Sequence, residues 1–198
     1  MASYARDTRT VPFTLTGTGT LDGQTIAFTG SGNIASLIVA GTFEAMPAQV
    51  KTLTTTGTFG AQGVSVPLTD TSVVFYDSNF KPVGSLSEGG YCVTSGTAAL
   101  PASVKVGDTG AWYAATCYTS RTKSVRVGIT TLSYAIESST ATSAVLRITT
   151  KVTPQTGAVI TQDLTYTITT AGTVGARETP FVGTSPMGIA VNLVFKYL

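Results

Sequence analysis

The chain contains no histidine at all. This absence excludes Ser-His-Asp and Cys-His catalysis, imidazole metal sites and histidine-based pH switches together, because each needs an imidazole ring. The two cysteines are too few for a thiolate metal site, so zinc would need carboxylates for its other ligands. We therefore expect a protein that is not an enzyme, with no catalytic residue, no metal site and no cofactor.

Charged side chains are also scarce. They make up 11% of the chain, against about 25% in an ordinary soluble domain. The net charge of +2 is too small to indicate a nucleic-acid partner. Threonine takes the missing share, at about a fifth of the residues, and it suits the solvent face of a strand while disfavouring helix. A surface of hydroxyls predicts an extracytoplasmic protein (periplasmic, cell-surface or secreted), with a virion as the alternative.

Long apolar runs are missing as well. No stretch approaches the roughly 18 apolar residues of a membrane helix, so we expect no transmembrane segment. The opening "MASYARDTRT" lacks the apolar core of a signal peptide. If the protein is exported, this chain corresponds to a mature form without its signal peptide.

Helical periodicity is nearly absent, and alternation of polar and apolar residues replaces it. Only "EAMPAQVKTL" could hold one helical turn, with Pro47 at its first position. Near the N-terminus, Asp22-Gly23 predicts a two-residue hairpin turn that places Leu21 opposite Gln24 and Thr20 opposite Thr25.

The second half of the chain predicts longer and more regular strands. In "SAVLRITTKVT", Leu146, Ile148 and Val152 share one face, and "AVITQDLTYTITT" turns Ile160 and Tyr166 inward in the same way. In "SVRVGITTLSYAIES" the apolar phase changes at residues 130–131, which predicts a bulge. The sequence thus predicts an all-β fold with almost no helix, either an antiparallel β-sandwich or a strongly curved half-barrel with a long-stranded C-terminal meander.

A single all-β domain over residues 1–198 accounts for the whole chain. The one clear change in composition is "SLSEGG" at 85–90. It could divide a hairpin-rich N-terminal lobe (1–87) from the C-terminal meander (88–198).

Several side chains that could carry chemistry have a simpler structural interpretation. "SRTK" (120–123) matches Ser-x-x-Lys but lies in a predicted hairpin turn, so we interpret it as a polar turn. Asp163 lies on the polar face of its strand, where a solvated charge is the default. Trp112 is expected to fill the core with Tyr113 at its rim, although exposed aromatics could also form a carbohydrate platform. Ligand-binding residues therefore stay unassigned.

The two cysteines, Cys92 and Cys117, each lie in a predicted strand. Their separation excludes a Cys-x-x-Cys redox motif. A cross-strand disulfide and a pair of buried thiols remain open. The disulfide would require Cα atoms within about 7 Å, which predicts that the two strands are neighbours. It would also favour an extracytoplasmic compartment.

These features favour a non-catalytic extracytoplasmic protein, in the cell envelope or secreted, with a binding or structural role. The alternative is a structural subunit of a virion or extracellular filament, because Thr/Gly-rich edge strands could pair with a protein partner or with further copies of the chain. A membrane-inserting, pore-forming protein is a third interpretation, since Ser/Thr residues alternate with aliphatic ones.

Overall fold

The computed structural model describes residues 8–96, 103–157, 159–171, 174–184 and 190–197. These residues form twelve β-strands. The strands are β1 (Thr10–Leu21), β2 (Gln24–Phe43), β3 (Met46–Ala61), β4 (Val64–Tyr76), β5 (Pro82–Ser87), β6 (Gly90–Ser95), β7 (Thr109–Tyr118), β8 (Arg126–Thr140), β9 (Ser143–Pro154), β10 (Ile160–Thr169), β11 (Val174–Thr184) and β12 (Ala190–Tyr197). Nowhere in the described ranges does a helix have the length and apolar character needed to cross a membrane.

Each strand pairs antiparallel with its neighbours in sequence, and β1 also pairs with β12, so the strand order closes into a ring. The predicted antiparallel, strongly curved all-β fold is confirmed. The helical turn considered around Pro47 is wrong, because that residue lies in β3 opposite Thr42 of β2. Glu44 and Ala45 both have positive φ (51° and 64°) and return the chain directly into the next strand.

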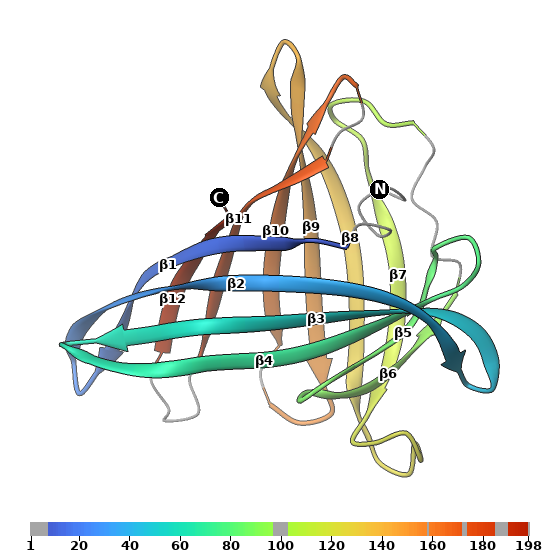
Figure 1. Ribbon diagram of the computed structural model, residues 1–198, viewed down its shortest axis with the longest axis horizontal. Helices are drawn as coiled ribbons and strands as arrows, with labels where there is room; N and C mark the ends of the chain where they lie inside the picture. Colours follow the sequence, from blue (N-terminus) through green and yellow to red (C-terminus); the bar gives the residue numbers. More distant parts are fainter. Residues whose placement is uncertain (1–7, 97–102, 158, 172–173, 185–189, 198) are drawn as a thin grey trace.

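The ring is closed through only part of its long strands. β4 pairs with β5 only over Val73–Tyr76, which leaves its first nine residues without a partner on that side among the described residues. β2 likewise runs on beyond the ladder that it shares with β1, which ends at Ala35. In Figure 1, β1 to β4 form a long blade that extends to the left and crosses in front of β7 to β11.

The hairpin predicted at the start of the fold is confirmed in its register. Leu21 lies opposite Gln24 and Thr20 opposite Thr25, with the turn at Asp22-Gly23. Asp22 and Gly23 both have positive φ, which is the geometry that a two-residue turn of this kind requires. The local sequence therefore determines this turn.

Three apolar clusters make up the core. The first lies between β1, β2 and β12, the second around the β2–β3 turn, β4 and β6, and the third between β8, β9 and β10. Their buried members are Phe13, Leu15, Ile26, Phe28, Val191 and Leu193 in the first, Phe43, Ala48, Phe75 and Tyr91 in the second, and Ile136, Leu146, Ile148 and Tyr166 in the third.

The second cluster lies on the opposite face of the sheet from the other two. Residues directly opposite one another on paired strands share a face, so the register can be followed from strand to strand. Cys92 and Cys117 share the face of the first and third clusters, whereas Val50 and Phe75 lie on the other face. The sheet therefore buries apolar side chains on both sides.

β2 changes its buried face along its length. Ile26 and Phe28 are buried near its start and Phe43 near its end, on opposite phases, although the β2–β3 register is unbroken. β8 also changes its buried face along its length. Val127 and Ile129 are half-buried on one face of the strand, and Ile136 is buried on the other. The bulge predicted at residues 130–131 is wrong, since both neighbouring ladders run through this point without a shift.

The pattern predicted for β9 is confirmed at Leu146 and Ile148, both of which are buried. On β10 the prediction holds for Tyr166 but is wrong for Ile160, which is 49% exposed. In the part of the chain that the structure describes, β10 pairs with β11 only from Thr165 onward, so its first residues have no strand partner there on that side. Residues 85–90 form the tight β5–β6 hairpin, and a division into two lobes there stays a prediction.

Candidate binding surface

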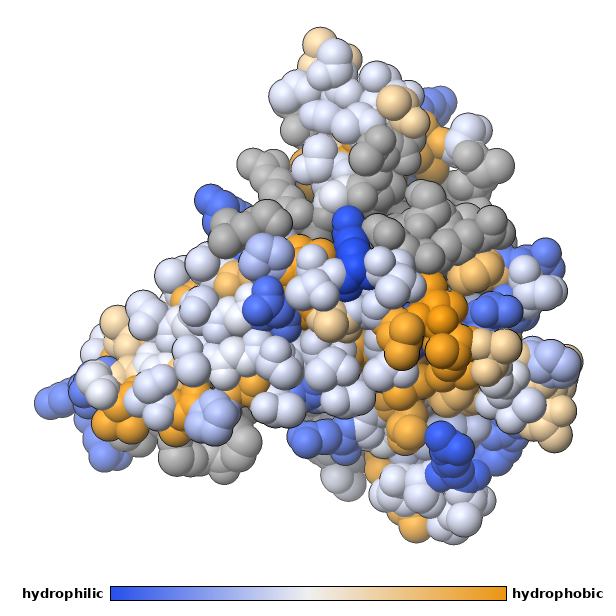
Figure 2. Space-filling model, viewed as in Figure 1, coloured by the Kyte–Doolittle hydropathy of each residue, from blue (hydrophilic) through white to orange (hydrophobic). Residues whose placement is uncertain are grey.

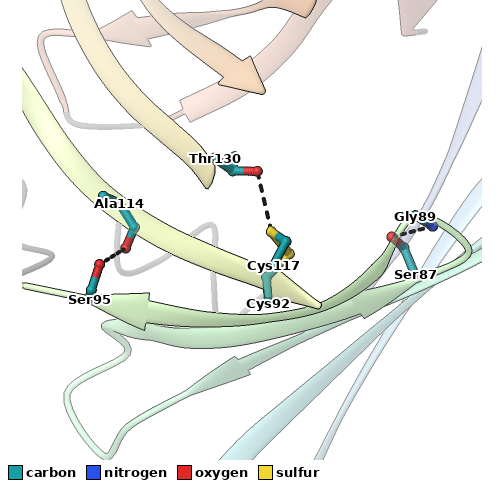
Figure 3. Close-up of a disulfide and its surroundings, with 7 residues drawn as sticks. All are labelled: Ser87, Gly89, Cys92, Ser95, Ala114, Cys117 and Thr130. Atoms are coloured by element: carbon teal, nitrogen blue, oxygen red, sulfur yellow. Dashed lines mark hydrogen bonds between the residues drawn. A yellow bond between two sulfur atoms is a disulfide. The ribbon is translucent and has the colours of Figure 1, made fainter. Parts of the chain in front are cut away.

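A disulfide joins the two cysteines across the neighbouring strands β6 and β7. Cys92 on β6 and Cys117 on β7 lie directly opposite each other, with sulfurs 2.06 Å apart and Cα atoms 4.0 Å apart (Figure 3). Of the two interpretations that the sequence leaves open, the structure contains the disulfide, and the two strands are neighbours, as the short Cα separation of a disulfide requires. Because β6 has only six residues, this bond reinforces a short ladder of five residue pairs between β6 and β7.

The β2–β3 turn is attached to the rest of the molecule through Glu44. Its carboxylate accepts a 2.5 Å hydrogen bond from the Tyr91 hydroxyl on β6 and forms an ion pair with Lys123 in the β7–β8 turn. Hydrogen bonds from Lys123 and then from Tyr91 lower the pKa of Glu44. Burial, followed by the Glu44 carboxylate, raises the pKa of Tyr91. Glu44 is therefore an anionic acceptor that ties three segments together.

Aromatic packing supports the same attachment from the apolar side. The ring of Phe43, which directly precedes Glu44, lies 4.7 Å from that of Phe75 and 5.5 Å from that of Tyr91. Gly84 lies beneath this group, because a Cβ atom there would come within 2.1 Å of Phe43 Cζ. The end of the β2–β3 hairpin is thus held by both an ion pair and a packed aromatic group.

β2 extends beyond the end of its ladder with β1, and this extension is apolar and largely exposed to solvent. Among the described residues, the backbone contacts on that side end where Ser36 bonds to the backbone of Arg9. From Leu37 to Phe43 the sequence "LIVAGTF" carries no charge and no proline, and no described strand pairs with it on that side. Leu37 and Val39 are 56% and 48% exposed. Figure 2 shows an apolar patch over this part of β2. We call Leu37–Phe43 the β2 edge.

The unpaired margin of β4 has a different character. It spans residues 64–72, "VSVPLTDTS", and also carries exposed apolar side chains at Val64 and Val66. Pro67 lacks a backbone N–H, and Asp70 adds a charge. Both features protect an edge strand from pairing with another chain. The described part of β4 therefore carries features that protect its unpaired margin, whereas the β2 edge has neither of them.

Asp163 is not the solvated charge that its strand position predicts. Arg147 on β9 binds Glu137 on β8 at 2.7 Å and Asp163 on β10 at 2.9 Å, and Thr149 donates a 2.6 Å hydrogen bond to Asp163. The prediction fails because the partners lie on neighbouring strands, which a single sequence does not align. Arg147 lowers the pKa of Glu137. A carboxyl group that acts as general acid, as in a glycosidase, needs a raised pKa instead, so the pKa of Glu137 is shifted in the opposite direction.

The remaining candidates keep their structural interpretations. The "SRTK" segment lies in a turn, where Ser120 Oγ is 2.8 Å from Thr122 Oγ1 and Lys123 pairs with Glu44. Trp112 packs against the third cluster and contacts the ring of Tyr113 edge-on at 5.3 Å. Burial raises the pKa of Tyr113 to about 12. These contacts favour packing over a carbohydrate platform.

Within the described ranges, no group of three metal-ligating side chains comes together. No protein-family model matches the chain, and neither does any curated protein or any solved structure. The surface features of this molecule are therefore interpreted from its own residues.

Sequence reasoning missed the β2 edge and Glu44. A signal for the first existed, because "SLIVAGTF" is an uncharged, proline-free run rich in β-branched and aliphatic residues. Glu44 has no comparable signal. Its partners Tyr91 and Lys123 are 47 and 79 residues away in the chain, and only the folded sheet brings them together.

Proposed function

We propose that this chain is a non-catalytic extracytoplasmic protein of the cell envelope or a secreted protein, with a structural or binding role. The observation that carries the proposal is the Cys92–Cys117 bond, since structural disulfides persist in oxidising compartments and are rare in the cytosol. The low charge and high threonine content agree with such a location. The absence of histidine removes the commonest general base and nucleophile activator.

The test is the redox state of the protein isolated from its native cells. The unreduced protein is alkylated and analysed by mass spectrometry, with fractionation of the cells in parallel. We expect Cys92 and Cys117 unmodified and the protein outside the cytoplasm. Two alkylated cysteines in a folded, cytoplasmic protein would reject the proposal. Protein that is reduced and denatured before alkylation controls for incomplete alkylation, because both cysteines should then be modified.

A structural subunit of a virion or extracellular filament is the second candidate, and the β2 edge favours it. An unprotected strand edge offers unpaired backbone groups to another chain. Electron microscopy of concentrated, purified protein tests this candidate, and a field of separate particles without ordered assemblies would count against it.

A further inference from the structure

We propose that the β2 edge pairs with the β2 edge of a second copy of this chain, in an antiparallel dimer whose sheet continues from one copy into the other. This inference deepens the proposed structural or binding role, on which it rests, by naming the partner. The partner surface is Leu37–Phe43 itself.

Backbone chemistry makes this segment receptive. Peptide groups on one side of β2 between Leu37 and Phe43 have no strand partner among the described residues, and the side chains along it are mostly exposed. Unpaired N–H and C=O groups in an edge strand are satisfied when another strand is added to the sheet. No charge or proline in the segment opposes that addition.

The segment is complementary to itself. An antiparallel pair centred on Ala40 places Val39 of one copy opposite Gly41 of the other. The space above Gly41 is occupied by Val50, whose Cγ2 would lie 2.7 Å from a Cβ atom built at Gly41. Val39 of the second copy would therefore meet both the small glycine and an apolar methyl group. The same register sets Leu37 opposite Phe43 at each end.

The charges at the two ends of the edge are also complementary. Arg9 lies beside Ser36 at one end, and Glu44 follows Phe43 at the other. Antiparallel pairing brings the end of the edge that carries Arg9 in each copy beside the end that carries Glu44 in the other, with the ion pair between Glu44 and Lys123 kept. Opposite charges at both ends favour this register over a parallel one, which would bring like charges together.

The edge is held in place before a partner arrives. Glu44 binds Tyr91 and Lys123, and Phe43 packs in the second cluster, so the end of the hairpin is fixed on two sides. A strand that is already ordered loses little conformational entropy on binding. The protected β4 margin of the same molecule, with Pro67 and Asp70, supplies an internal contrast.

Sedimentation equilibrium over a concentration series tests the dimer, with Val39→Lys as the disrupting variant. Val66→Lys on the β4 margin is the matched control, because both valines are 48% exposed and receive the same charge. We expect the wild type to form dimers, Val39→Lys to raise the dimer dissociation constant by about tenfold or more, and Val66→Lys to leave it unchanged. A monomeric wild type, or equal weakening by both variants, would overturn the proposal.

A cross-linking experiment checks the register. Both native cysteines are in the disulfide, so Ala40→Cys adds the one free thiol, and a symmetric pair centred there brings two such thiols within bonding distance. We expect a covalent dimer on mild oxidation of Ala40→Cys and none from the control Ser65→Cys. Equal cross-linking of the two would reject the assigned edge.

The two proposals fail separately. A Val39→Lys variant that keeps its disulfide and its circular dichroism spectrum, yet is monomeric, supports the dimer without bearing on location. Reduced cysteines in protein from native cells would reject the proposed compartment, whereas a monomeric wild type with an intact disulfide would reject the dimer alone.

Discussion

The Tyr91 hydroxyl donates a 2.5 Å hydrogen bond to Glu44 Oε1 across 47 residues of chain. Tyr91 lies on β6 and Glu44 in the β2–β3 turn, so this single contact joins the long N-terminal hairpin to the short central strands. It lies at one end of the β2 edge, and it links the stability of the fold to the shape of the proposed interface.

Replacing Tyr91 by phenylalanine should remove this hydrogen bond while keeping the ring in the second cluster. We expect the free energy of unfolding to fall by about 0.5–1.5 kcal/mol, measured by urea denaturation. Tyr118→Phe is the matched control, because Tyr118 lies directly opposite on β7 and its hydroxyl has no hydrogen-bond partner among the described residues. Equal losses in the two variants would contradict the assigned role of the Tyr91 hydroxyl.

Acid should weaken the fold through Glu44. Its pKa lies below its ordinary value of 4.5, so the ionised carboxylate favours the folded state. That stabilisation is complete at pH values above the unfolded pKa and is lost as the pH falls through the folded pKa.

Urea denaturation between pH 7 and pH 3 measures this effect. We expect Glu44→Gln to be less stable than the wild type at pH 7 and to lose less stability on acidification. Glu137, whose pKa Arg147 also lowers, contributes a similar decline, so Glu44→Gln flattens the profile only in part. Parallel profiles for wild type and Glu44→Gln would show that Glu44 contributes nothing.

Removing the disulfide should lower stability substantially. Cys92 and Cys117 are separated by 25 residues, and closing a loop of this size stabilises a fold by roughly 3–4 kcal/mol in the chain-entropy description. We expect Cys92→Ala/Cys117→Ala to lose about this much free energy of unfolding. A reducing agent should lower the stability of the wild type and leave that of the double variant unchanged.

Gly84 should tolerate no side chain. A Cβ atom there would lie 2.1 Å from Phe43 Cζ and 2.6 Å from the Cys92 carbonyl oxygen. We expect Gly84→Ala to cost about 1–3 kcal/mol through overpacking, seen as a lower midpoint of thermal unfolding. Gly89→Ala, where the nearest atom is Ser87 Oγ at 3.5 Å, should change stability little. A stable Gly84→Ala variant would show that the Phe43 ring can shift.

Arg147 should stabilise β8 to β10 by separating two carboxylates. Replacing it with methionine leaves Glu137 and Asp163 without their shared cation, and we expect a loss of about 1 kcal/mol at pH 7, since the group is partly exposed. The deficit should shrink as the pH falls through the lowered pKa of Glu137, because the protonated carboxyl group loses its ionic attraction to Arg147. Lys151→Met, on the same face of β9, is the control, and an equal deficit there would reject a specific ion-pair effect.

Local sequence predicts much of the strand framework. The Asp22-Gly23 turn and the alternation around Leu146 depend on neighbouring residues only, because turn geometry and pleat are properties of a short segment. Cys92 and Cys117 could be recognised as a candidate pair because they are the two cysteines of the chain and each lies in a predicted strand, although the sequence left buried thiols open. The low charge and the missing histidine limit the available chemistry through composition alone, because a side chain that is absent cannot act in any fold.

Tertiary structure decided what depends on distant partners. In the sequence, the change of buried face along β8 looks like a bulge at residues 130–131. That interpretation assumes that a strand buries the same face along its whole length. This curved sheet instead packs apolar side chains on both faces, so the buried face can change without a bulge. The sequence suggests a solvated Asp163 because its partner Arg147 lies on the neighbouring strand, and strand pairing is not visible in a single sequence. The β2 edge exists because the ladder with β1 ends at Ala35, and whether a strand edge is paired depends on the length of its neighbours rather than on its own residues.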